Sequence, residues 1–171
     1  MMKYCIFFLL NCILLGNIQA QEKTIWIVRH AEKDTTAAQK KDPPLTALGQ
    51  QRALDLANYL KGQEPKVIYS TNTSRTKQTA AHFLAKPVIY DPQLLTPLVE
   101  KILNLKKVEN ILIVGHSNTV LETIEAFGGS RPFASLSDED YDYIFKLSIN
   151  AQGQVITQAF HYGAIHHKKV N

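Results

Sequence analysis

The sequence has little cysteine, and both cysteines stand close to its start. Cys5 and Cys12 are the only two among 171 residues. A chain without cysteine after residue 20 has no disulfide framework there, no thiol nucleophile and no cysteine-ligated metal. The remaining part, about 150 residues, is long enough to be stabilised by its hydrophobic core alone.

The chain also lacks a strong charge bias, a long linker and internal repeats. Its 19 Lys and Arg exceed its 15 Asp and Glu by a net charge of +4, and these residues are evenly spread. Such a balance argues against a broad basic surface, so we expect no nucleic-acid partner. A composition of 45% apolar residues with 7 Pro and 8 Gly is typical of one globular domain, which we place at residues 21–171.

The first twenty residues differ from the rest. Lys3 precedes an apolar run over residues 5–15, after which the segment turns polar and reaches Ala20. A basic start, an apolar stretch too short to span a bilayer and a small final residue predict a signal peptide over residues 1–20. The alternative is an uncleaved amphipathic anchor. Cleavage would leave a periplasmic or secreted protein without a stable membrane anchor.

Strands and helices are expected to alternate along the remaining chain. Apolar, β-branched runs predict strands at 24–28, 67–69, 87–90 and 110–114, and a hairpin at 141–149 and 154–161. Helices are expected after Thr46 as N-cap, over 74–84, over 94–105, and from 120 to 128. This order predicts a three-layer α/β/α fold whose central sheet is mostly parallel and ends in an antiparallel hairpin.

Polar side chains follow three of the predicted strands. Arg29 and His30 follow the first, residues 70–75 follow the second, and His116 follows the fourth. The carboxyl ends of parallel strands meet at one rim of the sheet, where ligands bind in such folds. Arginine matches phosphate oxygens, a neutral histidine can attack phosphorus, and a protonated one can bond a phosphoryl oxygen. With no Walker-type loop and no Asp/Glu cluster at metal-ligand spacing, we expect a phosphate pocket without metal or cofactor.

Four segments carry a resemblance to a known family. They are VRHAEK (28–33), LTALG (45–49), YSTNTSRTKQTA (69–80) and VGHS (114–117). In this order they resemble the motifs of the histidine phosphatase superfamily, which includes cofactor-dependent phosphoglycerate mutases and short phosphohistidine phosphatases. Ala31 stands where glycine is commonest in the family.

The resemblance implies a role for each motif residue. His30 would be the nucleophile that becomes transiently phosphorylated, Arg29 and Arg75 would clamp the phosphoryl oxygens, and His116 would bond the same group. It implies a phosphatase acting on a small phosphorylated compound or on a protein that contains phosphohistidine. Asn118 either lines the mouth of this pocket or helps to start the helix that follows.

The proton donor of the family is missing from its usual places. Residues 90–97 contain no Glu, where mutase-like members carry one, and Ser117 stands where phytase-like members have an Asp. One explanation is another carboxylate, Glu32 or Asp91, although Glu32 is equally suited to an ion pair and Asp91 to a turn. A second is a substrate whose leaving group needs no strong protonation, such as a phosphoramidate or an anhydride. A third is a pocket that binds phosphorylated ligands with weak catalysis.

The short chain leaves little room for the inserted cap of mutases and phytases. This argues for the small phosphohistidine-phosphatase type and against mutase activity. Two other functions are kept as alternatives: a non-catalytic phosphate-binding module on the same fold, and a metal-binding protein using the six histidines. His166 and His167, followed by two lysines, are interpreted as a solvated basic tail.

Overall fold

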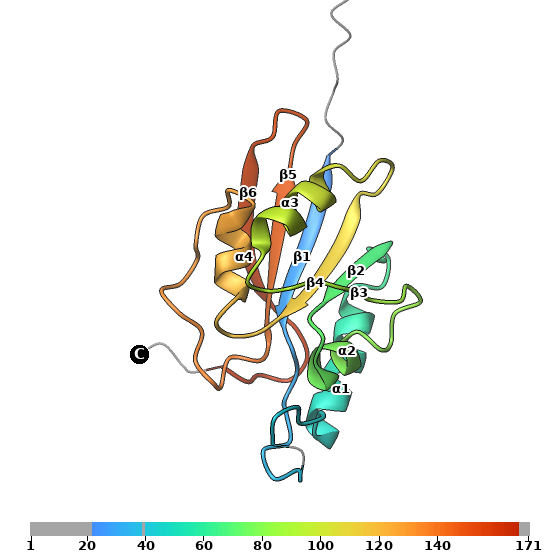
Figure 1. Cartoon of the computed structure of the whole chain (residues 1–171), viewed down its shortest axis with the longest axis vertical. Helices are drawn as coiled ribbons and strands as arrows, with labels where there is room; N and C mark the ends of the chain where they lie inside the picture. Colours follow the sequence, from blue (N-terminus) through green and yellow to red (C-terminus); the bar gives the residue numbers. More distant parts are fainter. Residues whose placement is uncertain (1–21, 39, 168–171) are drawn as a thin grey trace, which may run out of the picture.

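The structure, a computed structural model, describes residues 22–38 and 40–167, so the signal peptide expected over 1–20 lies outside the described residues. Strands and helices alternate along them in the expected order (Figure 1). The elements are β1 (Lys23–Arg29), α1 (Ala47–Tyr59), β2 (Val67–Ser70), α2 (Ser74–Thr79), β3 (Val88–Ile89), α3 (Leu95–Leu103), β4 (Asn110–Gly115), α4 (Val120–Ala126), β5 (Tyr143–Ile149) and β6 (Val155–His161). Within the described part of the chain, no helix combines the length and the apolar character needed to cross a membrane.

One mixed sheet holds the molecule together. The strand order is β3-β2-β4-β1-β5-β6, in which β1, β2, β3 and β4 run parallel. β5 pairs antiparallel with β1, and β6 pairs antiparallel with β5. The predicted mostly parallel sheet with a C-terminal antiparallel hairpin is confirmed.

Alternate residues of β1 face two separate hydrophobic clusters, one on each side of the sheet. Ile25 and Ile27 pack in the cluster that contains the buried residues of α3 and α4. Trp26 and Val28 pack in the cluster that contains the buried Leu56 of α1. Figure 1 shows α3 and α4 lying across the near face of the sheet. Since side chains of a strand point alternately to its two faces, the helices form the two outer layers of an α/β/α fold.

The LTALG segment fixes the start of α1 against the loop after β1. Thr46 is the N-cap, as predicted, and its Oγ1 accepts a hydrogen bond from the Gly49 amide at 3.0 Å. The Thr46 amide donates to the Glu32 carbonyl at 2.9 Å. A Cβ on Gly49 would collide with that same carbonyl, so only glycine permits this close approach. The segment therefore positions the loop that follows His30.

Helix α2 is shorter than the predicted 74–84 and ends at Thr79. The Oγ1 atoms of Thr76 and Thr79 donate to the backbone carbonyls of Thr71 and Arg75 at 2.9 and 2.8 Å. Such hydroxyl bonds compete with regular helix geometry. The following residues form turns, and Leu84 is 98% exposed.

Candidate active site

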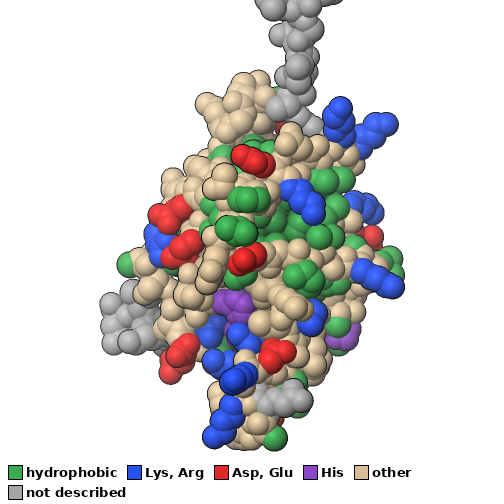
Figure 2. All heavy atoms as spheres, in the orientation of Figure 1, with side chains coloured by type: hydrophobic (Ala, Val, Ile, Leu, Met, Phe, Trp, Pro, Cys, Tyr) green, Lys and Arg blue, Asp and Glu red, His purple; other side chains and the backbone are tan. Residues whose placement is uncertain are grey.

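The carboxyl ends of β1 and β4 bring the two motif histidines together. Arg29 lies opposite Gly115 in the parallel pairing, and the His30 amide donates to the Gly115 carbonyl at 3.0 Å. The His30 and His116 ring centroids are 5.3 Å apart. Figure 2 shows histidine atoms with Lys and Arg side chains gathered in the lower half of this face, where these strands end. The cluster is therefore locally rich in positive charge.

His30 is buried and has one ring nitrogen engaged. Its Nδ1 lies 2.8 Å from the Ala31 carbonyl, which can only accept, so Nδ1 carries the hydrogen and Nε2 keeps a lone pair. Burial lowers the pKa of His30 to about 3, and the positive charges of Arg29, His116 and Arg75 act in the same direction. The imidazole is consequently neutral near pH 7 and presents Nε2 as its nucleophilic atom.

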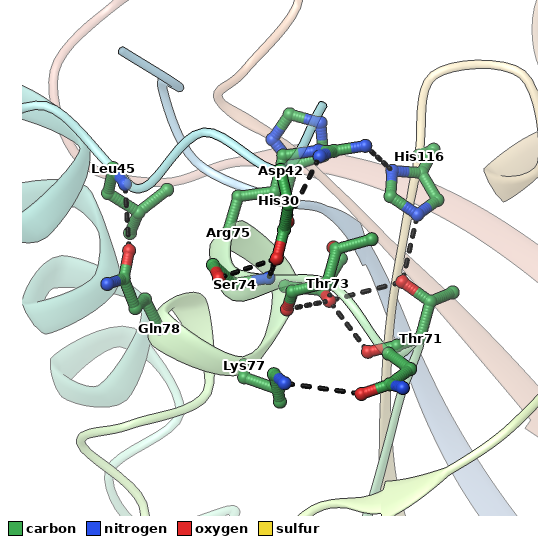
Figure 3. Close-up of polar contacts among 12 residues, drawn as sticks. His30, Asp42, Leu45, Thr71, Thr73, Ser74, Arg75, Lys77, Gln78 and His116 are labelled. Atoms are coloured by element: carbon green, nitrogen blue, oxygen red, sulfur yellow. Dashed lines mark hydrogen bonds and ion pairs between the residues drawn. The ribbon is translucent and has the colours of Figure 1, made fainter. Parts of the chain in front are cut away.

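His116 is held between a threonine and an arginine (Figure 3). Its Nδ1 lies 3.4 Å from Arg75 Nη2, and its Nε2 lies 2.8 Å from Thr71 Oγ1. Because a guanidinium only donates, Nδ1 accepts from Arg75 and Nε2–H donates to Thr71. Burial, followed by the charges of Arg75 and Arg29, lowers the pKa of His116 to about 4. No sequence pattern pointed to this contact between Thr71 and His116.

Arg75 reaches the histidines from α2 and is oriented by an aspartate. Its Nη1 lies 3.6 Å from Asp42 Oδ1. Asp42 in turn accepts hydrogen bonds from the amide and hydroxyl of Ser74 at 2.7–3.0 Å (Figure 3). Asp42 was missed because it lies between two motifs, in a segment without periodic pattern. An aspartate directly before Pro43 indicated only a loop.

Arg29 is oriented by the segment that precedes β5. It is 3% exposed, and its Nη1 donates to the Ser137 carbonyl at 2.8 Å. Its Nη2 donates to the Tyr141 hydroxyl at 3.3 Å and lies 3.4 Å from Asp138 Oδ1. The Tyr141 ring stacks under the guanidinium at 4.0 Å and lies 6.1 Å from the His30 ring. No motif pointed to Tyr141, whose residue type predicted only the start of a strand.

Glu32 forms a buried ion pair rather than facing the histidines with a free carboxyl group. Its Oε1 accepts from Arg52 Nε at 2.8 Å, and the two side chains are 8% and 1% exposed. Arg52 also donates to the carbonyls of Tyr162 and Ala164. This geometry favours the ion-pair interpretation of Glu32 over the proton-donor interpretation.

The structure does not bring the other two candidates into the cluster. Asp91 is exposed, and its Oδ1 accepts from the Gln93 amide at 2.9 Å, the bond of a turn former. Asn118 is exposed in the turn before α4, where Thr119 stands at the N-cap position. Four of the predicted site residues, Arg29, His30, Arg75 and His116, therefore meet at one place.

Comparison with known proteins agrees with this arrangement. The family model described as histidine phosphatase superfamily (branch 1) matches residues 25–95, a span that includes Arg29, His30 and Arg75. No curated protein sequence matches the chain.

Solved structures share the fold over most of the chain. A SixA protein from Nakamurella multipartitia is 21% identical, with a TM-score of 0.63 over 85% of this chain and 99% of that one. The protein histidine phosphatase SixA in complex with tungstate is 19% identical, with a TM-score of 0.65 over 81% and 96%. A phosphoserine phosphatase from Entamoeba histolytica is 14% identical, with a TM-score of 0.56 over 82% and 96%. Residues 25–95 therefore match the histidine phosphatase superfamily, and the chain shares the fold of these solved phosphatases.

Proposed function

We propose that the chain hydrolyses phosphorylated substrates through a phosphohistidine on His30. The observation that carries this proposal is a neutral imidazole whose Nε2 is free, flanked by two arginines with unpaired donors. The Nε atoms of Arg29 and Arg75 are buried without a hydrogen-bond partner among the described residues. A buried unpaired donor costs about 1–3 kcal/mol, and the oxygens of a phosphoryl group supply the missing acceptors.

The reaction takes two displacements at phosphorus. His30 Nε2 attacks in line, the P–N bond forms, and the bond to the leaving group breaks with its electron pair on that group. Arg29 and Arg75 offset the negative charge of the transferring oxygens, and His116 orients the Arg75 guanidinium through its Nδ1 lone pair. Water then attacks phosphorus, the P–N bond breaks, and neutral His30 and inorganic phosphate are released.

The carboxylates around the cluster are poorly suited to protonate a leaving group. They therefore favour a substrate whose leaving group already carries a proton. Hydrogen bonds from Ser74 hold the pKa of Asp42 below its usual range, so this group is ionised at neutral pH. Glu32 is engaged with Arg52, and Asp138 is 94% exposed beside Arg29. A phosphohistidine can carry a proton on its other ring nitrogen and leaves as neutral imidazole. We therefore propose a phosphohistidine-containing protein, or another phosphoramidate, as substrate. The shared fold of a protein histidine phosphatase bound to tungstate, a tetrahedral oxyanion, supports this choice.

The test is a substrate panel assayed with wild type and His30→Ala side by side. We expect phosphoramidates such as phosphohistidine to be hydrolysed about 100- to 10,000-fold faster than phosphoserine and sugar phosphates, the range that general acid catalysis is typically worth. His30→Ala should abolish turnover, and an alkaline quench should trap a phosphoenzyme only in wild type. His82→Asn, at an exposed histidine, is the matched control and should leave rates unchanged.

Three results would separate the alternatives. Full hydrolysis by His30→Ala would overturn the phosphohistidine route. Binding of phosphorylated ligands without any trapped phosphoenzyme would identify a non-catalytic phosphate-binding module. Equal rates on esters and phosphoramidates would overturn the proposed substrate class while leaving the nucleophile in place.

We further propose that the protein is exported to the periplasm or secreted. The support is the pattern of residues 1–20, with Lys3 before an apolar run and Ala20 at its end. Intact-mass analysis of the protein from fractionated cells should give a chain that starts at Gln21 outside the cytoplasm. A chain that still starts at Met1 in the cytoplasmic or membrane fraction would contradict the proposal.

A further inference from the structure

A second cluster of ionisable side chains lies where β5 and β6 pair, separate from the phosphate pocket. Asp142 directly precedes β5, His161 is the last residue of β6, and His167 lies in the C-terminal segment. The Nδ1 atoms of His167 and His161 lie 2.7 and 3.3 Å from Asp142 Oδ2. One potential ligand atom from each of the three residues lies within 4.8 Å of the other two. The strand pairing, with His161 opposite Tyr143, brings His161 next to Asp142, and the C-terminal segment brings His167 to the same carboxylate.

The Asp142 carboxylate is buried beside groups that carry no fixed positive charge. Its side chain is 1% exposed, and its ion-pair partners within residues 22–38 and 40–167 are the two histidines. Its Oδ1 is buried without a hydrogen-bond partner in the same part of the chain. Burying a carboxylate costs several kcal/mol unless a cation or hydrogen bonds compensate it. A divalent cation at this place would supply that compensation.

The two imidazole rings are already oriented toward the carboxylate. The Tyr143 ring centroid lies 4.4 Å from that of His161 and 5.6 Å from that of His167, and the two imidazoles are 4.4 Å apart. These contacts restrict both rings while their Nδ1 atoms face Asp142. His161 is 47% exposed and His167 is 22% exposed, so an ion has access from solvent. The cluster is therefore both preorganised and open.

We infer that Asp142, His161 and His167 bind Zn²⁺. Two imidazoles and one carboxylate are a ligand set that suits zinc, with the fourth tetrahedral position left to water. At metal–ligand distances of about 2.0–2.1 Å, tetrahedral ligand atoms stand about 3.3 Å from one another. The observed 2.7 and 3.3 Å separations require only small adjustments to reach this geometry.

The ion would fasten the C-terminal segment to the residues that orient Arg29. Asp142 directly follows Tyr141, whose ring supports the Arg29 guanidinium. The Tyr141 amide donates to the His166 carbonyl at 2.9 Å, next to the proposed ligand His167. Zinc therefore acts as a structural ion at the edge of the active site, and its binding does not depend on the proposed reaction.

The test is a titration of EDTA-treated, tag-free protein with ZnCl₂, followed by calorimetry and thermal unfolding. We expect one Zn²⁺ per chain and a higher Tm in zinc than in EDTA. His161→Asn and His167→Asn should each weaken binding at least as much as the loss of an outer-shell partner, about 10- to 100-fold. His82→Asn controls for zinc binding at an exposed histidine. His30→Ala controls for zinc binding between the two histidines of the phosphate pocket. Both variants should bind zinc as wild type does.

The outcomes decide the assignment whether or not every variant is equally stable. Both substituted histidines are partly exposed, so equal Tm values in EDTA will show that the variants are folded. Titration with Co²⁺ in place of Zn²⁺ gives a second readout. We expect the absorption of tetrahedral Co²⁺ in wild type and its loss in either variant. Substoichiometric binding by wild type, unchanged affinity in both variants, or loss of binding in His30→Ala would overturn the proposal.

Discussion

At the scale of single residues, the pocket combines two neutral imidazoles with two positively charged guanidinium groups. Burial keeps both imidazoles neutral, with pKa values lowered to about 3 for His30 and about 4 for His116. The permanent positive charges are those of the Arg29 and Arg75 guanidinium groups. A nucleophile that is already deprotonated needs no general base, and the arginines are available for the anionic substrate.

The lowered pKa of His30 should make the protein less stable in mild acid. The unfolded chain binds a proton at this residue below about pH 6.5, while the folded protein does so only near pH 3. The free energy of unfolding should therefore fall as the pH drops through this window, by about 1.5 kcal/mol from His30 between pH 6.5 and 5. Urea unfolding of wild type and His30→Asn across that range checks this. Parallel pH dependences of the two proteins would contradict it.

Tyr141 should act as a positioning residue for Arg29. Tyr141→Phe removes the hydroxyl that accepts from Arg29 Nη2 and keeps the ring that lies 4.0 Å below the guanidinium. A hydrogen bond is typically worth about 0.5–1.5 kcal/mol, so kcat/KM should fall by about 2- to 12-fold, and Tyr141→Ala should lower it further. Steady-state kinetics on a phosphoramidate give the values, with the half-exposed Tyr59→Phe as control. A wild-type rate in Tyr141→Ala would exclude the role.

At the scale of elements, one buried ion pair joins the loop after β1 to helix α1. Glu32 lies in that loop, and Arg52 lies on the buried side of α1. Arg52 also bonds two carbonyls beyond β6, so the pair connects three segments that are far apart in the sequence. The loop that it holds begins immediately after His30.

Glu32→Gln distinguishes this structural role from proton donation. Breaking a buried pair from one side typically costs about 3–5 kcal/mol, because the other charge stays buried without its partner. We expect the free energy of unfolding in urea to fall by that amount, while the ratio of ester to phosphoramidate hydrolysis stays unchanged. Glu64→Gln, which breaks an exposed pair with Lys66, should change stability by less than about 1 kcal/mol. A normal stability with a selective loss of ester hydrolysis would instead make Glu32 the proton donor.

Sequence patterns predicted the elements that carry strong local signals and missed contacts that local signals do not encode. The β-branched run of β4 and the Thr46 cap were predicted because periodicity and capping are local properties. Asp42 and Tyr141 were missed because their partners, Arg75 and Arg29, come from distant segments. The contact of Asp142 with His161 follows from strand register, and the contact with His167 follows from the path of the C-terminal segment; no spacing along the chain reveals either.

At the scale of the whole molecule, the C-terminal segment contacts helix α1 and the residues that precede β5. The carbonyls of Tyr162 and Ala164 accept from Arg52, and the carbonyl of His166 accepts from the Tyr141 amide. The His166 Nδ1 also lies 2.6 Å from the Glu139 carbonyl. Through Tyr141, residues near the end of the chain thus support the arginine that ends β1.

Removal of residues 165–171 should consequently impair the reaction. The truncation keeps both carbonyl acceptors of Arg52, so the buried ion pair and the sheet should stay intact. It deletes the His166 carbonyl that accepts from Tyr141, so the guanidinium of Arg29 loses part of its support. We expect kcat/KM to fall several-fold in EDTA, where zinc binding plays no part, with little change in far-UV circular dichroism. Removal of 168–171 alone is the matched control. Equal kcat/KM values for the two truncations would show that the 137–142 segment holds Arg29 without the C-terminal segment.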